Sequence, residues 1–191
     1  MKISDKLVNR FVNMEIIPSA DREVYLYGVH LLFAALINVL STICIGILMG
    51  MVWESILFLI TFIPIRTYAG GYHARTQGQC YVISLIINLF AMFVIKWSID
   101  YSVIRFAVFA ISQIGIFLVA PVDNENKVLT DQEKKIYRNC LRALLCGIDG
   151  IVLICWIVRC EWIISSIEVA VSVVFVMILL EKAKNIRSIK K

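Results

Sequence analysis

Apolar residues in this chain are gathered into long runs that are almost free of charge. Between Glu23 and Arg66, for example, the only formally charged side chain is Glu54. A helix that crosses a bilayer needs about 20 largely apolar residues, with roughly 17–25 as the working range. Six runs meet this requirement, at residues 26–48, 51–68, 80–97, 104–121, 142–158 and 162–180. The pattern predicts an all-α, polytopic integral membrane protein with about six hydrophobic helices, folded as a single membrane domain over residues 1–191.

Residues 1–18 follow a different pattern, which predicts an amphipathic helix. Lys6, Arg10 and Asn13 lie away from the apolar face of that helix. The apolar face is formed by Ile3, Leu7, Val8, Phe11 and Met14. A basic amphipathic helix of this kind lies in the plane of the lipid headgroups. A water-exposed helix that precedes the first span is the alternative.

Composition excludes an ordinary water-soluble domain. The chain is 60% hydrophobic and 17% charged, with a mean hydropathy of +0.84. Soluble domains have about 45–50% apolar and about 25% charged residues. With so little polar surface the chain requires lipid as its solvent.

The distribution of lysine and arginine predicts the orientation. With six spans, 16 of the 19 basic residues fall on one side, and Lys96, Arg105 and Arg159 fall on the other. The positive-inside rule places the majority side, with both termini and a basic tail at 181–191, in the cytoplasm. The net charge of +5 therefore reflects topology and contact with lipid headgroups, and it does not indicate nucleic acid binding.

The six cysteines do not indicate a disulfide framework or a metal site. Cys44, Cys146 and Cys155 fall inside predicted spans, and the chain has no CxxC pair and no Cys/His spacing typical of zinc. No metal or other cofactor is expected. Cys80 differs from the other cysteines because of its surroundings.

The segment from residue 66 to residue 80 is a short, polar, glycine-rich loop between two spans, and it carries His73 and Cys80. On one continuous helix these two residues would be about 10.5 Å apart along the axis, too far for a hydrogen bond. Gly70, Gly71 and Gly78 permit a bend that would bring them together. The loop therefore predicts a catalytic His–Cys dyad on the condition that the chain folds back.

Several features of this loop favour a reactive cysteine. Cys80 begins a span, so its thiol lies at the positive end of a helix dipole, which favours the thiolate. Arg66 and Arg75 add positive potential at the membrane boundary. Backbone N–H groups of Gly70 and Gly71 could bind a developing oxyanion. The alternative is a chance His–Cys pair, in which Cys80 is a structural residue.

The loop over residues 121–142 is the longest and most charged. Thr130 and Glu133 form the capping-box pattern, which predicts a short cytoplasmic helix starting near Asp131. Pro64 is expected to weaken the end of the second span, and could leave it re-entrant.

Three further polar residues lie within apolar runs. Asp149 is about 10 Å into the membrane by helical rise, and it could orient His73 or pair with a polar group in the bundle. The second interpretation is favoured. Glu168 lies toward the outer half, too far out to serve the dyad, and His30 is most simply a membrane-buried side chain bonded to a neighbour.

The stretch Ile65 to Arg75, with Gly-x-His-Ala at its centre and Cys80 after it, resembles the accessory gene regulator protein B (AgrB) family of bacterial quorum sensing. The segment from Ala120 to Lys127 resembles it too, and so do the length, the six apolar runs and the basic tail. Val128 departs from the pattern, since many relatives have proline there. That difference puts the details of the substrate-binding loop in doubt.

The resemblance implies an integral-membrane cysteine endopeptidase of the bacterial cell membrane. By the family pattern, Cys80 corresponds to the nucleophile, His73 to the base, and Arg66 and Gly71 to supporting residues. The implied substrate is a small amphipathic, AgrD-like propeptide, which is cleaved through a thioester and closed into a thiolactone. A homodimer is also implied. The alternative functions are a peptide exporter or a binding scaffold without proteolysis, either of which would keep its activity in a Cys80→Ala variant.

Overall fold

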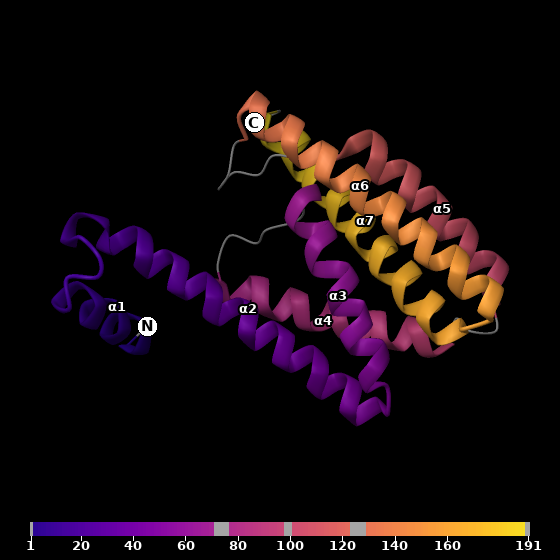
Figure 1. Ribbon diagram of the computed structural model, residues 1–191, viewed down its shortest axis with the longest axis horizontal. Helices are drawn as coiled ribbons and strands as arrows, with labels where there is room; N and C mark the ends of the chain where they lie inside the picture. Colours follow the sequence, from indigo (N-terminus) through magenta and orange to yellow (C-terminus); the bar gives the residue numbers. More distant parts are fainter. Residues whose placement is uncertain (1, 71–76, 98–100, 123–128, 190–191) are drawn as a thin grey trace. The chain divides into compact units, whose positions relative to one another are not determined.

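The structure is a computed structural model that describes residues 2–70, 77–97, 101–122 and 129–189 (Figure 1). This part of the chain is helical and contains no strand. Its elements are α1 (Lys2–Asn13), η1 (Ser19–Asp21), α2 (Arg22–Met49), α3 (Val52–Ala69), α4 (Gln77–Trp97), α5 (Ser102–Val119), α6 (Asp131–Val158) and α7 (Glu161–Ile189). The predicted all-α polytopic membrane fold is confirmed.

Each of the six predicted spans corresponds to one helix from α2 to α7. Five of these helices are long and apolar enough to cross a membrane, whereas Tyr81–Trp97 of α4 is a shorter apolar helix. The exposed surface is rich in large apolar side chains such as Leu48 and Val103, which are 86% and 81% exposed. Such a surface is stable against lipid and not against water.

The helix boundaries correct two details of the sequence-based prediction. Pro64 lies inside α3 and the helix continues to Ala69, because one missing N–H is tolerated where neighbouring helices pack around it. The capping box at Thr130 is confirmed, but the helix that it starts is not short and runs without interruption to Val158.

The chain divides into two compact units, residues 1–41 and 42–191. In the first unit, Arg22 at the start of α2 links back to α1. Its guanidinium donates to Asn9 Oδ1 at 2.8 Å and to Asp5 Oδ1 at 3.3 Å. These bonds are half-exposed, and exposed ion pairs contribute about 0–1 kcal/mol each. The predicted amphipathic helix is confirmed as α1, and its position in the headgroup plane stays a prediction.

In the second unit, α7 is the central helix, and α3, α4, α5 and α6 all pack against it (Figure 1). Every residue from Ile164 to Val171 is buried. Among them, Ser165 and Ser166 donate hydrogen bonds to the carbonyl of Trp162, so their hydroxyls are satisfied within the helix. The apolar core extends from α7 to Ile65 on α3, Ile116 on α5 and Leu141 on α6.

Close approaches and buried hydrogen bonds hold this unit together. A Cβ added at Gly115 of α5 would overlap the ring of Phe175 on α7, and one added at Gly46 would overlap the side chain of Ser55. Asn88 of α4 donates to Thr42 Oγ1 at 2.6 Å, and this bond is buried. Small residues at contacts and polar side chains between helices are the usual means by which membrane helices associate.

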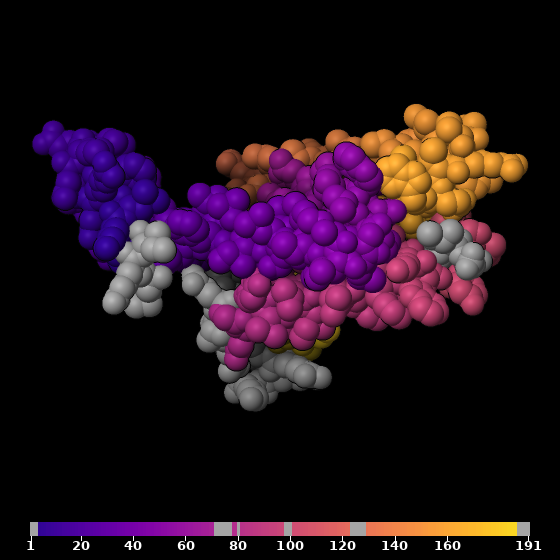
Figure 2. All heavy atoms as spheres, turned by 90° about the horizontal axis from the view of Figure 1, so that it is seen from below, coloured from indigo at the N-terminus to yellow at the C-terminus, as the bar shows by residue number. Residues whose placement is uncertain are grey.

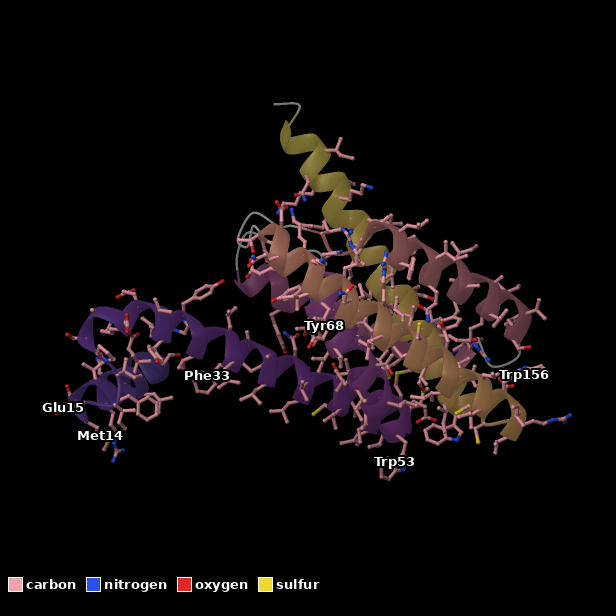
Figure 3. All side chains as sticks on the ribbon, turned by 45° about the horizontal axis from the view of Figure 1, so that its top comes forward. Met14, Glu15, Phe33, Trp53, Tyr68 and Trp156 are labelled. Carbon is pink, nitrogen blue, oxygen red and sulfur yellow. The ribbon has the colours of Figure 1, made fainter. Side chains whose placement is uncertain are left out.

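All four tryptophans lie near helix ends, at the starts of α3 and α7 and at the ends of α4 and α6. We call this end of the second unit the Trp end. Trp53 and Trp156 point outward from it (Figure 3) and are 71% and 68% exposed. Exposed tryptophans at helix ends are typical of a membrane–water interface. The opposite end, where α3 and α7 end, carries Arg66 and is called the Arg66 end.

Candidate functional site

The predicted dyad falls largely outside the described residues. His73, Gly71 and Arg75 belong to the segment 71–76, which lies outside them. Cys80 lies in the first described turn of α4, so its backbone is at the amino end of that helix, but its side chain is not among those described. The pairing of His73 with Cys80 therefore stays a prediction.

Arg66, a predicted supporting residue, lies in the last turn of α3 and reaches across to α7. Its Nη1 donates to the Sδ of Met177 at 3.0 Å, and its guanidinium carbon is 5.8 Å from the centre of the Phe62 ring. A cation within about 6 Å of a ring face is attracted to it. These contacts anchor the guanidinium at the Arg66 end.

Gly70 ends α3 in a conformation that an L-residue adopts with strain, with φ at +79°. Its N–H donates to the Arg66 carbonyl at 3.1 Å, and a Cβ at this position would overlap the carbonyl oxygen of Val122. The N–H of Val122 also donates to the Ala69 carbonyl at 3.1 Å. Because its own N–H is used by the helix end, this geometry does not support Gly70 as an oxyanion donor. Glycine is needed here for close approach to the segment after α5.

The Arg66 end also brings together aromatic and charged side chains from α3, α5, α6 and α7. Tyr68 on α3 meets Tyr137 on α6 edge to face, with 5.7 Å between ring centres. Arg142 on α6 lies over the Phe117 ring, 4.3 Å from its centre. Glu181 on α7 is fully buried, one helical turn beyond Met177. Glu181 is not anticipated from the sequence, because the charge pattern assigns residues 181–191 to a basic tail, whereas α7 continues to Ile189.

Asp149 is exposed and is paired with a polar side chain of a neighbouring helix. Gln113 on α5 donates through Nε2 to Asp149 Oδ1 on α6, at 2.6 Å. This agrees with the favoured interpretation, in which Asp149 bonds to a polar neighbour. Its possible role toward His73 is a separate prediction, because His73 lies outside the described residues.

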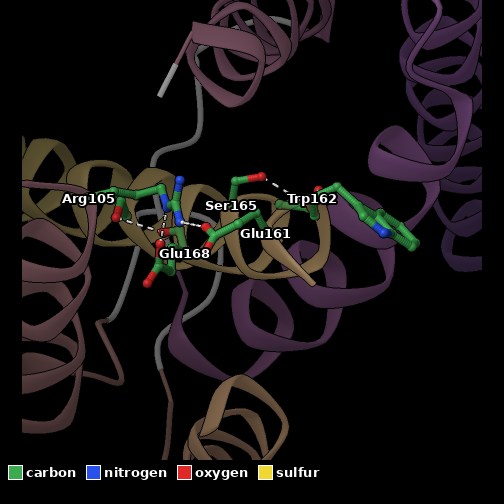
Figure 4. A network of polar contacts seen from close by, with 7 residues as sticks. Arg105, Glu161, Trp162, Ser165 and Glu168 are labelled. Carbon is green, nitrogen blue, oxygen red and sulfur yellow. Dashed lines mark hydrogen bonds and ion pairs between the residues drawn. The ribbon is translucent and has the colours of Figure 1, made fainter. Parts of the chain in front are cut away.

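A charged network at the Trp end was not anticipated from the sequence (Figure 4). Arg105 of α5 is 7% exposed, and its Nε donates to Glu168 Oε2, on a carboxylate that is 2% exposed. Its Nη2 donates to Glu161 Oε2 at 2.7 Å. The sequence feature that could have indicated this network is the spacing of Glu161 and Glu168, which are seven residues apart and so share one face of α7. From the sequence, Arg105 is predicted only to be one of the three basic residues on the outer side.

Among the described residues, no group of three or more His, Cys, Asp or Glu side chains is arranged to hold a metal ion. His30 lies on α2 with its Nε2 buried and without a hydrogen-bond partner in the described part of the chain, so the predicted bond to a neighbour is not seen.

Comparisons with known proteins place the chain in a family. The family described as accessory gene regulator B matches residues 2–181. Two AgrB-like proteins of Clostridium perfringens are 32% and 30% identical to this chain, each over 138 residues, which is 68% of this chain and 64% of the relative. Protein FsrB of Enterococcus faecalis is 31% identical over 70 residues, which is 37% of this chain and 29% of that protein.

The matched region thus spans slightly less than two thirds of the length of the Clostridium relatives. No solved structure gives a significant match. The family match covers nearly the whole chain, including residues 66–80, which carry His73 and Cys80, all of α2 to α6 and most of α7. This chain is therefore a membrane protein that belongs to the accessory gene regulator B family, which takes part in quorum sensing.

Proposed function

We propose that this protein is a membrane cysteine endopeptidase in which Cys80 is the nucleophile and His73 the general acid and base. The observation that carries the proposal is the position of Cys80 in the first described turn of α4, within a family match that includes the whole loop. Unpaired N–H groups at a helix start give a positive potential that favours a thiolate.

The proposed substrate is a small amphipathic, AgrD-like propeptide that lies on the cytoplasmic leaflet. The Cys80 thiolate attacks a backbone carbonyl carbon of the peptide, and the C–N bond to the C-terminal tail breaks. His73 donates the proton that the departing amine requires. The products of this half-reaction are the free tail and a thioester between the peptide and Cys80.

The second half-reaction closes a ring. A cysteine thiol within the bound peptide loses its proton to His73 and attacks the thioester carbonyl, and Cys80 leaves as the thiolate. One thioester is exchanged for another, so the step is close to balanced, and it competes with hydrolysis only where water is kept out. The surrounding lipid and helices are suited to that exclusion.

Charge at the Arg66 end supports the choice of substrate. Lys134, Lys135 and Arg138 lie on the first turns of α6, and Lys182 and Lys184 lie near the end of α7. A cytoplasmic location for this end follows from the positive-inside rule. An acidic C-terminal tail on the propeptide would be attracted to it. The proposed oligomer is a homodimer, as the family resemblance implies.

The proposal is tested with purified protein in vesicles of phosphatidylglycerol and phosphatidylethanolamine. The probe is the cognate propeptide, sought as a short reading frame with an internal cysteine beside this gene and synthesised with a fluorophore on its C-terminal tail. Cys80→Ala and His73→Ala should each abolish release of the tail. Cys80→Ser should leave no thioester adduct on mass spectrometry, whereas the unmodified protein should show one.

Cys44→Ala and Cys146→Ala are the matched controls, because both cysteines are exposed free thiols outside the loop. Both variants should cleave at the normal rate. Retained cleavage or transport in Cys80→Ala would contradict the protease assignment and favour an exporter or a binding scaffold.

A further inference from the structure

A groove of about 440 Å³ runs between α4, α5 and α7 in the second unit. This volume falls within the range of roughly 300–1,000 Å³ typical of ligand pockets. In the space-filling view α4, which forms one wall, lies on the outside of the unit (Figure 2). Opposing apolar side chains line the groove, including Ile87, Phe90 and Val94 on α4 and Val173, Val176 and Met177 on α7.

The two ends of the groove differ. Toward the Trp end its lining includes Arg105 and Glu168, whose charges are paired with each other. Toward the Arg66 end its lining includes Met177 and Leu180. Met177 also accepts the hydrogen bond from Arg66, so one side chain contacts both the groove and a residue of the proposed site. The groove is thus bounded by an ion pair toward one end, and at the other end its lining on α4 begins at Ile86, six residues after Cys80.

We propose that this groove binds an apolar segment of the substrate peptide and thereby presents the following residues of that peptide to the first turn of α4. The inference rests on the proposed function. It assigns to α4, α5 and α7 a substrate subsite within the membrane region. This subsite does not include His73 or Cys80.

The continuity of α4 is the first argument. Cys80 and Ile87 lie on the same helix, and seven residues correspond to about 10 Å along its axis. An extended peptide covers that distance with about three residues, at 3.3–3.6 Å for each residue. A peptide whose apolar side chains occupy the groove therefore has its next few residues within reach of the amino end of α4.

Charge is the second argument. Lys182 is exposed and Lys184 half-buried, on the turn of α7 that follows Leu180. These two lysines outnumber Glu181 on the same turn, so a ligand that leaves the groove at this end meets a net positive charge, which suits an apolar segment followed by acidic residues. Met177 contributes a flexible side chain to the lining of the groove, since an unbranched thioether fits apolar partners of different shape.

The experiment uses p-benzoylphenylalanine as a photo-crosslinking residue at two positions of α7 in the full-length protein. Val173 lines the groove, whereas Leu179 is 44% exposed on the same helix and does not line it. The protein is placed in phosphatidylglycerol and phosphatidylethanolamine vesicles with the fluorescent propeptide. We expect peptide adducts from position 173 and phospholipid adducts from position 179. Phospholipid adducts alone at both positions would mean that an acyl chain fills the groove, and would overturn the inference.

Val173→Trp and Leu179→Trp form a matched pair for kinetics. Filling the groove with an indole should raise KM for the propeptide about tenfold or more with little change in kcat, and alkylation of Cys80 by iodoacetamide should keep its normal rate. Leu179→Trp should match the unmodified protein in all three measurements. Equal KM values for the two variants would overturn the groove assignment while loss of cleavage in Cys80→Ala still supported the protease. Cleavage retained in Cys80→Ala would remove both proposals.

Discussion

The buried network of Arg105, Glu161 and Glu168 allows a quantitative prediction about stability. Glu168→Ala removes the more buried of the two carboxylates that Arg105 contacts, and it leaves Arg105, a residue that is 7% exposed, in contact with Glu161. Removing one partner of a buried ion pair typically costs about 3–5 kcal/mol, because the other charge stays buried. Glu161 compensates in part, so we expect a loss of about 3 kcal/mol in the free energy of unfolding.

Glu161→Ala is the internal comparison. The Glu161 side chain is 43% exposed, in contrast to 2% for Glu168. An ion pair that reaches solvent or headgroups contributes about 0–1 kcal/mol. Both variants remove one carboxylate from the same guanidinium, so the difference between them reports the effect of burial.

The assay is equilibrium unfolding in mixed micelles by stepwise addition of SDS, followed by far-UV circular dichroism. The double variant Arg105→Met/Glu168→Met removes both buried charges and should recover most of the stability, since apolar replacement of a buried pair is often neutral. Equal losses for Glu168→Ala and Glu161→Ala, or a double variant that is less stable than Glu168→Ala, would refute the reasoning.

Two further substitutions test other parts of the structure. Gly70→Ala places a Cβ against the Val122 carbonyl at a φ of +79°; it should lower propeptide cleavage by displacing the end of α3, while Gly78→Ala, where a Cβ meets nothing within 4 Å, should have a smaller effect. An equal loss in the two variants would contradict this explanation. Thr130→Ala removes the side-chain acceptor for the Glu133 N–H, 3.3 Å away, and should cost about 1 kcal/mol in SDS unfolding. Thr130→Ser should restore it, and a Ser variant as unstable as the Ala variant would argue against capping.

The structure gives the two ends of the second unit different characters. The Trp end has exposed tryptophans and the buried Arg105 network, whereas the Arg66 end has the lysines of α6 and α7 and the Tyr68–Tyr137 pair. This asymmetry suits the proposed action on a peptide from one side of the membrane. The apolar groove is the feature that extends from one end toward the other.

Hydrophobic patterning alone was sufficient to predict the number, type and approximate limits of the helices. Each of the predicted runs became one helix, because an apolar segment of this length in lipid must satisfy its backbone hydrogen bonds internally. The capping box at Thr130 could also be predicted from the sequence, since capping depends on residues three positions apart. Local rules were less reliable for helix ends, as Pro64 and the continuous α6 show.

The contacts between helices could not be predicted in this way. Nothing in the order of residues indicated that Arg66 would meet Met177, that Gly70 would approach Val122, or that Arg105 would be buried with Glu168. These contacts join residues that are about 50 to more than 100 positions apart, and they depend on which faces of α3, α5 and α7 pack together. The sequence by itself determined which segments are helical and apolar, because both properties are local. Only the tertiary structure decided which charges are paired, which glycines are needed for close approach and where a groove remains, because those depend on the shape of the packed bundle.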